Sequence, residues 1–182
     1  MKKRDLAFAF AGGLAVGVGV KMLKRAKTVN WDDVYDQVPH SDHSHFINVE
    51  GARVHYQEFG DRTNPSLVLI HGYTASLYVW HKVAPVLADA GFHVIAVDLI
   101  GFGYSEKPKW FDYSIDAQAR MVSRLMNRLG IGQATLVGSS YGGAVAMTIC
   151  LDYPEYVEKL VLIDAVINDE VLAHPILRLA AI

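Results

Sequence analysis

The sequence has only one cysteine, Cys150, so no disulfide can form within the chain. Cys150 lies in an apolar run (AVAMTIC), where a buried and inert thiol is expected. The sequence also lacks an excess of positive charge, with 17 Lys and Arg against 19 Asp and Glu. Nucleic-acid binding needs a basic surface, so we expect no nucleic-acid partner. With 52% hydrophobic residues over 182 positions, the chain is expected to fold as one domain.

Charge is absent from residues 6–20 (LAFAFAGGLAVGVGV), which lie between two basic clusters. A helix of this length is shorter than the hydrocarbon core of a bilayer, unless Met22 and Leu23 extend it while Lys21 turns its amine outward. No small-residue cleavage site follows, which favours an uncleaved hydrophobic helix over a signal peptide. We therefore expect residues 1–27 to anchor the protein in a membrane, with a signal-like segment or an interfacial or soluble helix as alternatives. Both flanks of the segment are basic, so the sequence does not indicate on which side of the membrane the folded part lies.

Residues 28–45 are polar and mixed, and we interpret them as a linker. Its end, PHSDHSH, contains His40, Asp42, His43 and His45, which could suggest a metal site. No predicted strand precedes these residues to fix them as ligands, so a solvated linker is favoured. We expect no metal and no organic cofactor.

From residue 46 onward, short apolar runs alternate with longer helical stretches. Residues 46–51 and 52–60 are predicted to form two antiparallel strands joined by a turn at Glu50 and Gly51. Continuous Val, Leu and Ile strands separated by helices are typical of an α/β fold with a mostly parallel, doubly wound sheet. Such sheets bind ligands at the carboxyl ends of their strands. The later strands are predicted at 66–70, 93–98, 134–138 and 159–164, and the helices at 76–90, 114–129 and 141–152.

The loop after the predicted 134–138 strand contains a G-x-S-x-G pattern, from Gly138 to Gly142, followed by a predicted helix. A nucleophile elbow needs this context, because glycines on both sides let the chain turn sharply around a strained serine. The spacing selects Ser140 and leaves Ser139 as the variable residue. An ordinary glycine-rich turn is the alternative. The pattern therefore predicts Ser140 as a catalytic nucleophile.

A serine that attacks a carbonyl group needs hydrogen-bond donors for the resulting oxyanion. The loop after the 66–70 strand can bring the amide of Tyr73 to the elbow, and Tyr141 follows Ser140 at a helix N-terminus. We therefore predict the N–H groups of Tyr73 and Tyr141 as the oxyanion hole. His71 is expected to order its loop rather than act as the base. Asp98 is expected to bind turn amides, with a catalytic acid as the alternative.

Four segments in register, HGYTASLYVW, DLIGFGYSEKP, GSSYGG and LVLIDA, resemble the α/β-hydrolase fold superfamily over residues 46–165. The branch they resemble includes lipase- and esterase-like serine hydrolases, C–C bond hydrolases and haloalkane dehalogenases. The resemblance implies a serine hydrolase that acts on a small-molecule ester or similar carbonyl substrate. Dehalogenases and epoxide hydrolases carry aspartate at the elbow, so Ser140 argues against both chemistries. A C–C bond hydrolase and a catalytically inactive binding protein remain the alternatives.

The resemblance also implies an acid and a histidine that follow the serine, with the histidine after the last strand. The only histidine after Ser140 is His174, in a segment from about residue 166 that resembles the beginning of a lid. Asp164 ends the last predicted strand and is a candidate for the acid, although a polar strand end is favoured. We therefore expect residues 46–182 to form an incomplete core, truncated after about the sixth strand, in the N-terminal part of a longer enzyme. The sequence leaves the oligomeric state open.

Overall fold

The computed structural model describes residues 30–166 of a chain that divides into two compact units, residues 1–33 and 34–182. Of the first unit, residues 30–33 are described, and Trp31–Asp33 form a single 3-10 turn. The membrane anchor expected over residues 1–27 lies outside the described residues, as do His174 and the lid beyond residue 166. Between residues 30 and 166, no helix combines the length and the apolar character that crossing a bilayer requires.

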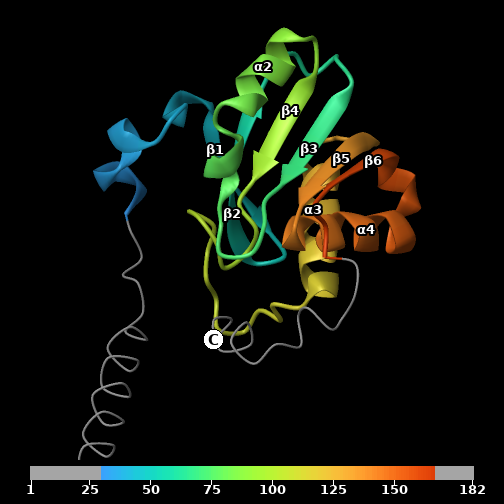
Figure 1. Cartoon of the computed structure of the whole chain (residues 1–182). Coiled ribbons are helices and arrows are strands. Elements are labelled where there is room, and N and C mark those ends of the chain that lie inside the picture. The colour runs from blue at the N-terminus through green and yellow to red at the C-terminus, as the bar shows by residue number, and fades with distance from the viewer. Residues whose placement is uncertain (1–29, 167–182) are drawn as a thin grey trace, which may run out of the picture. The chain divides into compact units, whose positions relative to one another are not determined.

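Six strands of the second unit form one sheet in the order β1-β2-β4-β3-β5-β6 (Figure 1). The first two strands are antiparallel to each other, and β2 is also antiparallel to β4. The pairs β3–β4, β3–β5 and β5–β6 are parallel, which confirms the predicted mostly parallel α/β sheet. The strands are β1 (Ser44–Val49), β2 (Ala52–Phe59), β3 (Ser66–Ile70), β4 (His93–Val97), β5 (Ala134–Ser139) and β6 (Val157–Ile163).

The hairpin between β1 and β2 turns at Glu50 and Gly51, as the sequence predicted. Both residues have positive φ angles, 50° and 91°, which a two-residue hairpin turn of the type I′ class requires. The side chain of Asn48 accepts a hydrogen bond of 3.0 Å from the Gly51 amide and closes the turn.

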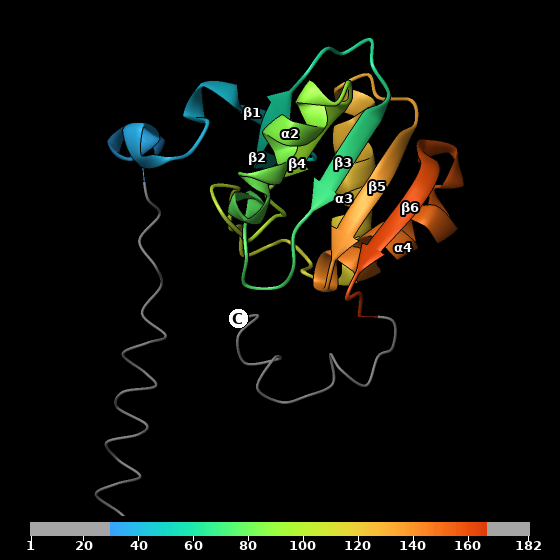
Figure 2. The same cartoon turned by 45° about the horizontal axis from the view of Figure 1, so that its top comes forward.

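Helices cover both faces of the sheet (Figure 2). One face carries α2 (Val83–Asp89), and the other carries α3 (Ile115–Arg128) and α4 (Tyr141–Asp152). The single helix predicted over residues 76–90 was wrong, because a 3-10 turn, η4 (Leu77–Trp80), takes its first part. The Leu77 amide is bound by the carboxylate of Asp98 and the Tyr78 amide by the hydroxyl of Ser76, so these amides are tied to neighbouring side chains before α2 begins.

Each face of the sheet has its own hydrophobic core. The larger core lies under α3 and α4, where Leu125, Leu136 and Ile149 have no exposed surface. The smaller core lies under α2 and includes Leu69 and Trp80, the latter only 7% exposed. Trp80 therefore anchors η4 against the sheet.

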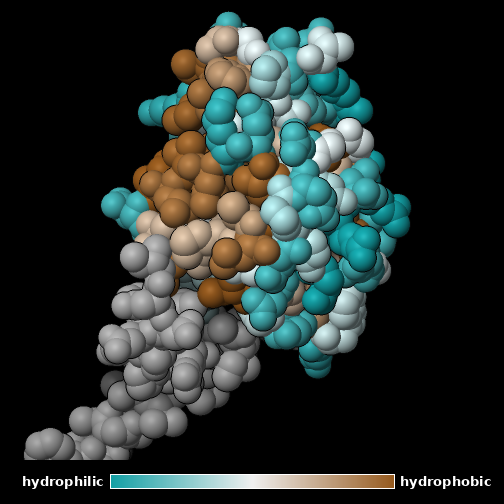
Figure 3. All heavy atoms as spheres, turned by 90° about the vertical axis from the view of Figure 1, so that its right-hand side faces the viewer, coloured by the Kyte–Doolittle hydropathy of each residue, from teal (hydrophilic) through white to brown (hydrophobic). Residues whose placement is uncertain are grey.

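The strand β6 lies at the end of the sheet, and no residue in the described part of the chain pairs with its outer edge. Its apolar residues Val161, Leu162 and Ile163 are 44%, 40% and 41% exposed. Figure 3 views this side of the molecule and shows hydrophobic side chains gathered there. Parallel strands are normally covered on both faces, and an exposed apolar edge is a site of association.

We expect the chain to self-associate through β6 and the substitution Leu162→Lys to weaken that association. A lysine on an edge strand places a charge where a second strand would have to pair. Sedimentation velocity at several protein concentrations measures the effect as a lower average mass. Val86→Lys is the matched control, since Val86 is 64% exposed on α2. If both variants associate as the unsubstituted chain does, β6 is not the contact.

Candidate active site

The loops that follow β3 and β5 meet at the carboxyl edge of the sheet. From β3 the chain passes to β4 on one side, whereas β5 lies on the other side, so this is the switch point at which open α/β sheets bind ligands. A Cβ atom added to Gly72 would lie 3.3 Å from Cβ of Ser140 and 3.9 Å from its Oγ. The structure therefore brings together two of the loops that the sequence singled out.

Ser140 stands between the end of β5 and the first residue of α4. Its φ of 51° and ψ of −115° are a strained conformation for a residue with a side chain. Its amide donates to the carbonyl of Ile163 at 2.9 Å, and its own carbonyl accepts from the amides of Gly143 and Val166 at 3.0 and 3.1 Å. These hydrogen bonds fix the strained backbone of Ser140 through both its amide and its carbonyl. The residue remains half-buried. The predicted strand, sharp turn and helix are all present.

The two predicted oxyanion donors lie in the loops beside Ser140. Tyr141 is the first residue of α4, and the first amides of a helix lack partners within the helix. The partial positive charge of that helix end favours an anion near Ser140. Tyr73 follows Gly72, which contacts the serine side chain. Their assignment as oxyanion donors stays a prediction.

Three aromatic rings pack beside the serine. The ring of Tyr73 lies 5.8 Å from that of Tyr141 and 5.7 Å from that of Phe102, and the rings of Phe102 and Tyr141 are 6.5 Å apart. Phe102 was not predicted as a site residue. It lies between Gly101 and Gly103 in the loop after β4, and ligand sites were expected at the carboxyl ends of such strands. The three rings form an apolar wall at the switch point.

The phenol groups of this wall stay protonated at neutral pH. Burial raises the pKa of Tyr141 to about 12, and the neighbouring Tyr73 and Asp112 add to the shift. Burial also raises the pKa of Tyr73. The Tyr141 hydroxyl donates to the carbonyl of Tyr113 at 3.3 Å. These side chains therefore supply apolar surface and hydrogen-bond donors, and neither is suited to act as a general base.

His71 is fully buried and holds the loop after β3 in place. Its Nε2 accepts a hydrogen bond of 3.1 Å from the Leu99 amide, so the proton of the neutral ring is on Nδ1, which donates to the Gly72 carbonyl at 2.7 Å. Burial lowers the pKa of His71 and favours this neutral form. The expected loop-ordering role is confirmed by these contacts.

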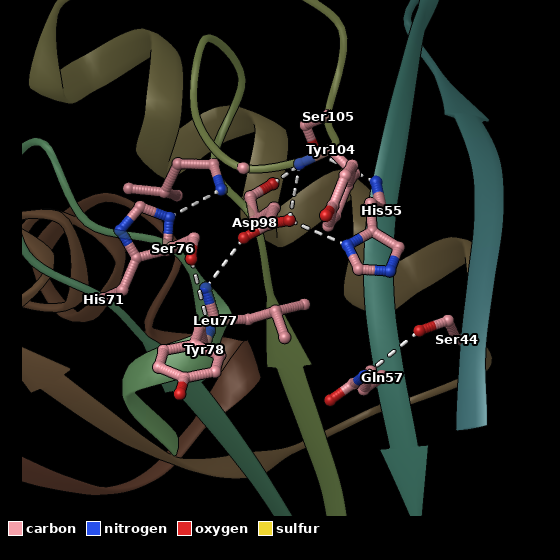
Figure 4. A network of polar contacts seen from close by, with 12 residues as sticks. Ser44, His55, Gln57, His71, Ser76, Leu77, Tyr78, Asp98, Tyr104 and Ser105 are labelled. Carbon is pink, nitrogen blue, oxygen red and sulfur yellow. Dashed lines mark hydrogen bonds and ion pairs between the residues drawn. The ribbon is translucent and has the colours of Figure 1, made fainter. Parts of the chain in front are cut away.

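Asp98 is fully buried and ties three segments together (Figure 4). Its Oδ1 accepts from the Leu77 amide at 2.7 Å, and its Oδ2 accepts from the Tyr104 amide at 2.8 Å. The ring nitrogen Nδ1 of His55 lies 2.7 Å from the same Oδ2. Burial alone would raise the pKa of Asp98, but the hydrogen bond and charge of His55 and the two amides outweigh burial and lower it.

These contacts agree with the expected binding of turn amides by Asp98. The pairing with His55 was missed, because His55 in β2 is 43 residues away from Asp98 in the sequence. The available signal was a histidine in a strand with many buried residues.

The base and the acid that Ser140 would need are not brought to it by residues 30–166. Within that range, the Ser140 hydroxyl makes no hydrogen bond to a histidine or a carboxylate. Asp164 directly follows β6, where it is exposed and has a φ of 47°. It makes no side-chain hydrogen bond to a described histidine. The described residues therefore supply the candidate nucleophile and its donors, and the roles of Asp164 and His174 stay open.

No cluster of three or more His, Cys, Asp or Glu residues suited to a metal ion occurs among the residues that the structure describes. The histidines before β1 bind backbone carbonyls instead. His40 Nε2 lies 2.9 Å from the carbonyl oxygen of His81, and His43 Nδ1 lies 2.9 Å from that of Glu58. The ring of His43 also stacks on Phe59 at 4.4 Å.

Comparison with known proteins gives the same fold. A family model described as the alpha/beta hydrolase fold matches residues 65–180. The chain is 40% identical over 126 residues to the 2-hydroxy-6-oxononadienedioate/2-hydroxy-6-oxononatrienedioate hydrolase of Burkholderia vietnamiensis (strain G4 / LMG 22486), covering 65% of this chain and 43% of that protein. It is 34% identical over 119 residues to bifunctional epoxide hydrolase 2 of Sus scrofa, covering 65% of this chain and 21% of that protein.

Among solved structures, a membrane phospholipase A described as a bacterial virulence factor is similar with a TM-score of 0.69 and 30% sequence identity. The similarity covers 90% of this chain and 52% of that one. The chain thus spans about half of that structure, and less of the two curated relatives.

Proposed function

Because the chain belongs to the α/β-hydrolase fold family, we propose that it is a serine hydrolase in which Ser140 attacks an ester or a similar carbonyl group. The observation that carries this proposal is the backbone of Ser140, held at φ 51° and ψ −115° between β5 and α4. A strained serine at a strand-to-helix turn, at the switch point of a parallel sheet, is the geometry that a nucleophile elbow requires.

The described residues supply the first half of the reaction. The Ser140 oxygen attacks the carbonyl carbon, and the negative charge that develops on the substrate oxygen is bound by the amides of Tyr73 and Tyr141. Collapse of this intermediate expels the alcohol and leaves an acyl-enzyme, which water then hydrolyses. A base must take the serine proton, and it has to come from outside residues 30–166.

We propose a membrane-tethered enzyme whose small-molecule substrate has an apolar part. The membrane phospholipase A, whose fold matches most of this chain, supports an ester substrate of this kind. The aromatic wall of Tyr73, Phe102 and Tyr141 offers apolar surface next to the serine. The tether would be the hydrophobic segment of residues 1–27.

C–C bond hydrolysis is the second candidate, and the 40% identity to the Burkholderia hydrolase favours it. Its substrates are carbonyl compounds, so the elbow and its donors would serve the same attack. The epoxide hydrolase relatives share the fold, but the elbow of this chain carries serine rather than the aspartate expected for that chemistry.

A fluorophosphonate probe tests the proposed nucleophile directly. We expect the protein to be labelled in a form that also supplies the base, and Ser140→Ala to abolish labelling, because the probe forms its bond with the activated serine oxygen. Ser139→Ala is the matched control and should keep labelling, since Ser139 is the last residue of β5. Labelling is read by in-gel fluorescence and by mass spectrometry of the modified peptide. No labelling, or equal labelling in both variants, would support the inactive binding protein instead.

A further inference from the structure

A cavity of about 350 Å³ has a lining that does not include Ser140 or the predicted oxyanion donors. Its walls come from residues 34–39, from β2, from η4 and from the loop after β4, and none of its lining residues belongs to 71–73 or 138–141. The volume is at the lower end of the range for small-molecule sites. The cavity therefore has the size of a ligand site and is lined by residues other than the candidate nucleophile and its donors.

The buried amide of Gln57 gives this cavity a specific polar group. Gln57 is 1% exposed, and its Nε2 donates to the carbonyls of Pro39 and His40 at 2.7 and 3.1 Å and to the Ser44 hydroxyl at 3.1 Å. Two of these partners can only accept, which fixes the nitrogen on that side. No residue between 30 and 166 donates to Oε1, and Figure 4 shows this oxygen on the side away from Ser44.

Gln57 lines the cavity, and a ligand donor there can take the place of water as the partner of Oε1. The other lining residues indicate what kind of molecule could carry this donor group. Val34, Val38 and Leu77 present apolar surface. Asp98 also belongs to the lining, and its negative charge disfavours an anion there.

We propose that this cavity binds a small uncharged molecule with an apolar body and one hydroxyl or amide N–H group that donates to Gln57 Oε1. The apolar body contacts the valine and leucine side chains, and the donor binds Oε1 of Gln57 in the cavity wall. A carboxylate-bearing analogue is excluded by the charge of Asp98.

Three probes of equal or similar size test the donor requirement: 1-hexanol, its isomer 1-methoxypentane, and hexanoate. In nitrogen-15 spectra of the full chain, we expect 1-hexanol to shift the side-chain amide signal of Gln57 and the backbone signals of Leu77 and Tyr78. One hydrogen bond corresponds to about a fivefold change in affinity, so the ether should bind about fivefold more weakly. Hexanoate should give no shift at these signals.

The variant Val38→Trp fills the cavity and should abolish the shifts, whereas Val86→Trp on exposed α2 should leave them unchanged. Val34→Phe replaces Val38→Trp if the larger side chain prevents folding, and the comparison of alcohol with ether needs no variant. Equal affinity for alcohol and ether, or shifts that persist in the filled variants, would overturn the proposal. Shifts confined to Tyr73 and Tyr141 would place the alcohol at the serine instead and overturn it as well.

Discussion

Asp98→Asn is expected to lower the free energy of unfolding by about 1–3 kcal/mol, the cost of leaving a buried polar group without its hydrogen-bond partner. The carboxylate accepts from the amides of Leu77 and Tyr104 and is paired with His55. An asparagine has one oxygen and one NH₂ group, so its NH₂ must face at least one of these donors. The substitution thus leaves a buried N–H without an acceptor, which is the source of the loss.

The effect of Asp98→Asn depends on pH in a defined direction. The pKa of Asp98 is lowered in the folded chain, so its carboxylate contributes stability that is fully present above the ordinary aspartate pKa of about 3.9. That contribution is lost as the pH falls through the lower pKa of the folded state. The difference between the two proteins should therefore shrink as the pH falls below about 4.

Urea unfolding at a series of pH values measures both effects. Asp89→Asn is the control, because Asp89 is exposed at the end of α2 and makes no described side-chain contact. It should change the free energy of unfolding by less than about 0.5 kcal/mol. If Asp98→Asn were as mild as this control at neutral pH, Asp98 would not be the anchor that joins η4 to the loop after β4.

The elbow could be predicted from the sequence because its requirements are local. Glycines at fixed distances from Ser140, an apolar strand before it and a helix after it follow from the backbone geometry of one sharp turn. The same holds for the turn at Glu50 and Gly51, where two positive φ angles are needed. Such signals lie within a few residues and need no knowledge of the rest of the fold.

Contacts between distant segments could not be predicted in this way. Asp98 was expected to bind turn amides, but the pairing with His55 depends on the register of β2 against β4. The same carboxylate also explains why the helix expected over residues 76–90 begins late, since it binds the amide of Leu77. Phe102 packs against Tyr73 and Tyr141 only because the loops after β3, β4 and β5 converge at one edge of the sheet.

Gly142→Ala is expected to cost about 3 kcal/mol or more, or to prevent folding, although alanine is the better helix former by about 1 kcal/mol. A Cβ atom at Gly142 would meet the carbonyl oxygens of Ile70 and His71 and would lie 2.7 Å from the carbonyl carbon of Ile70. These are backbone atoms at the end of β3, so no side chain can rotate away. The start of α4 would have to move from β3, and the turn at Ser140 would move with it.

Gly132→Ala separates this clash from the general effect of adding a methyl group. A Cβ atom there has no heavy atom within 4 Å, so the variant should differ from the unsubstituted chain by less than about 0.5 kcal/mol. Urea unfolding measures both variants, and fluorophosphonate labelling shows whether the serine keeps its geometry. Because Gly142 touches the same loop that carries Tyr73, we expect its substitution to lose labelling as well as stability. Equal stability of the two variants would mean that α4 does not approach β3 this closely, and the donors predicted at Tyr73 and Tyr141 would then not face one serine.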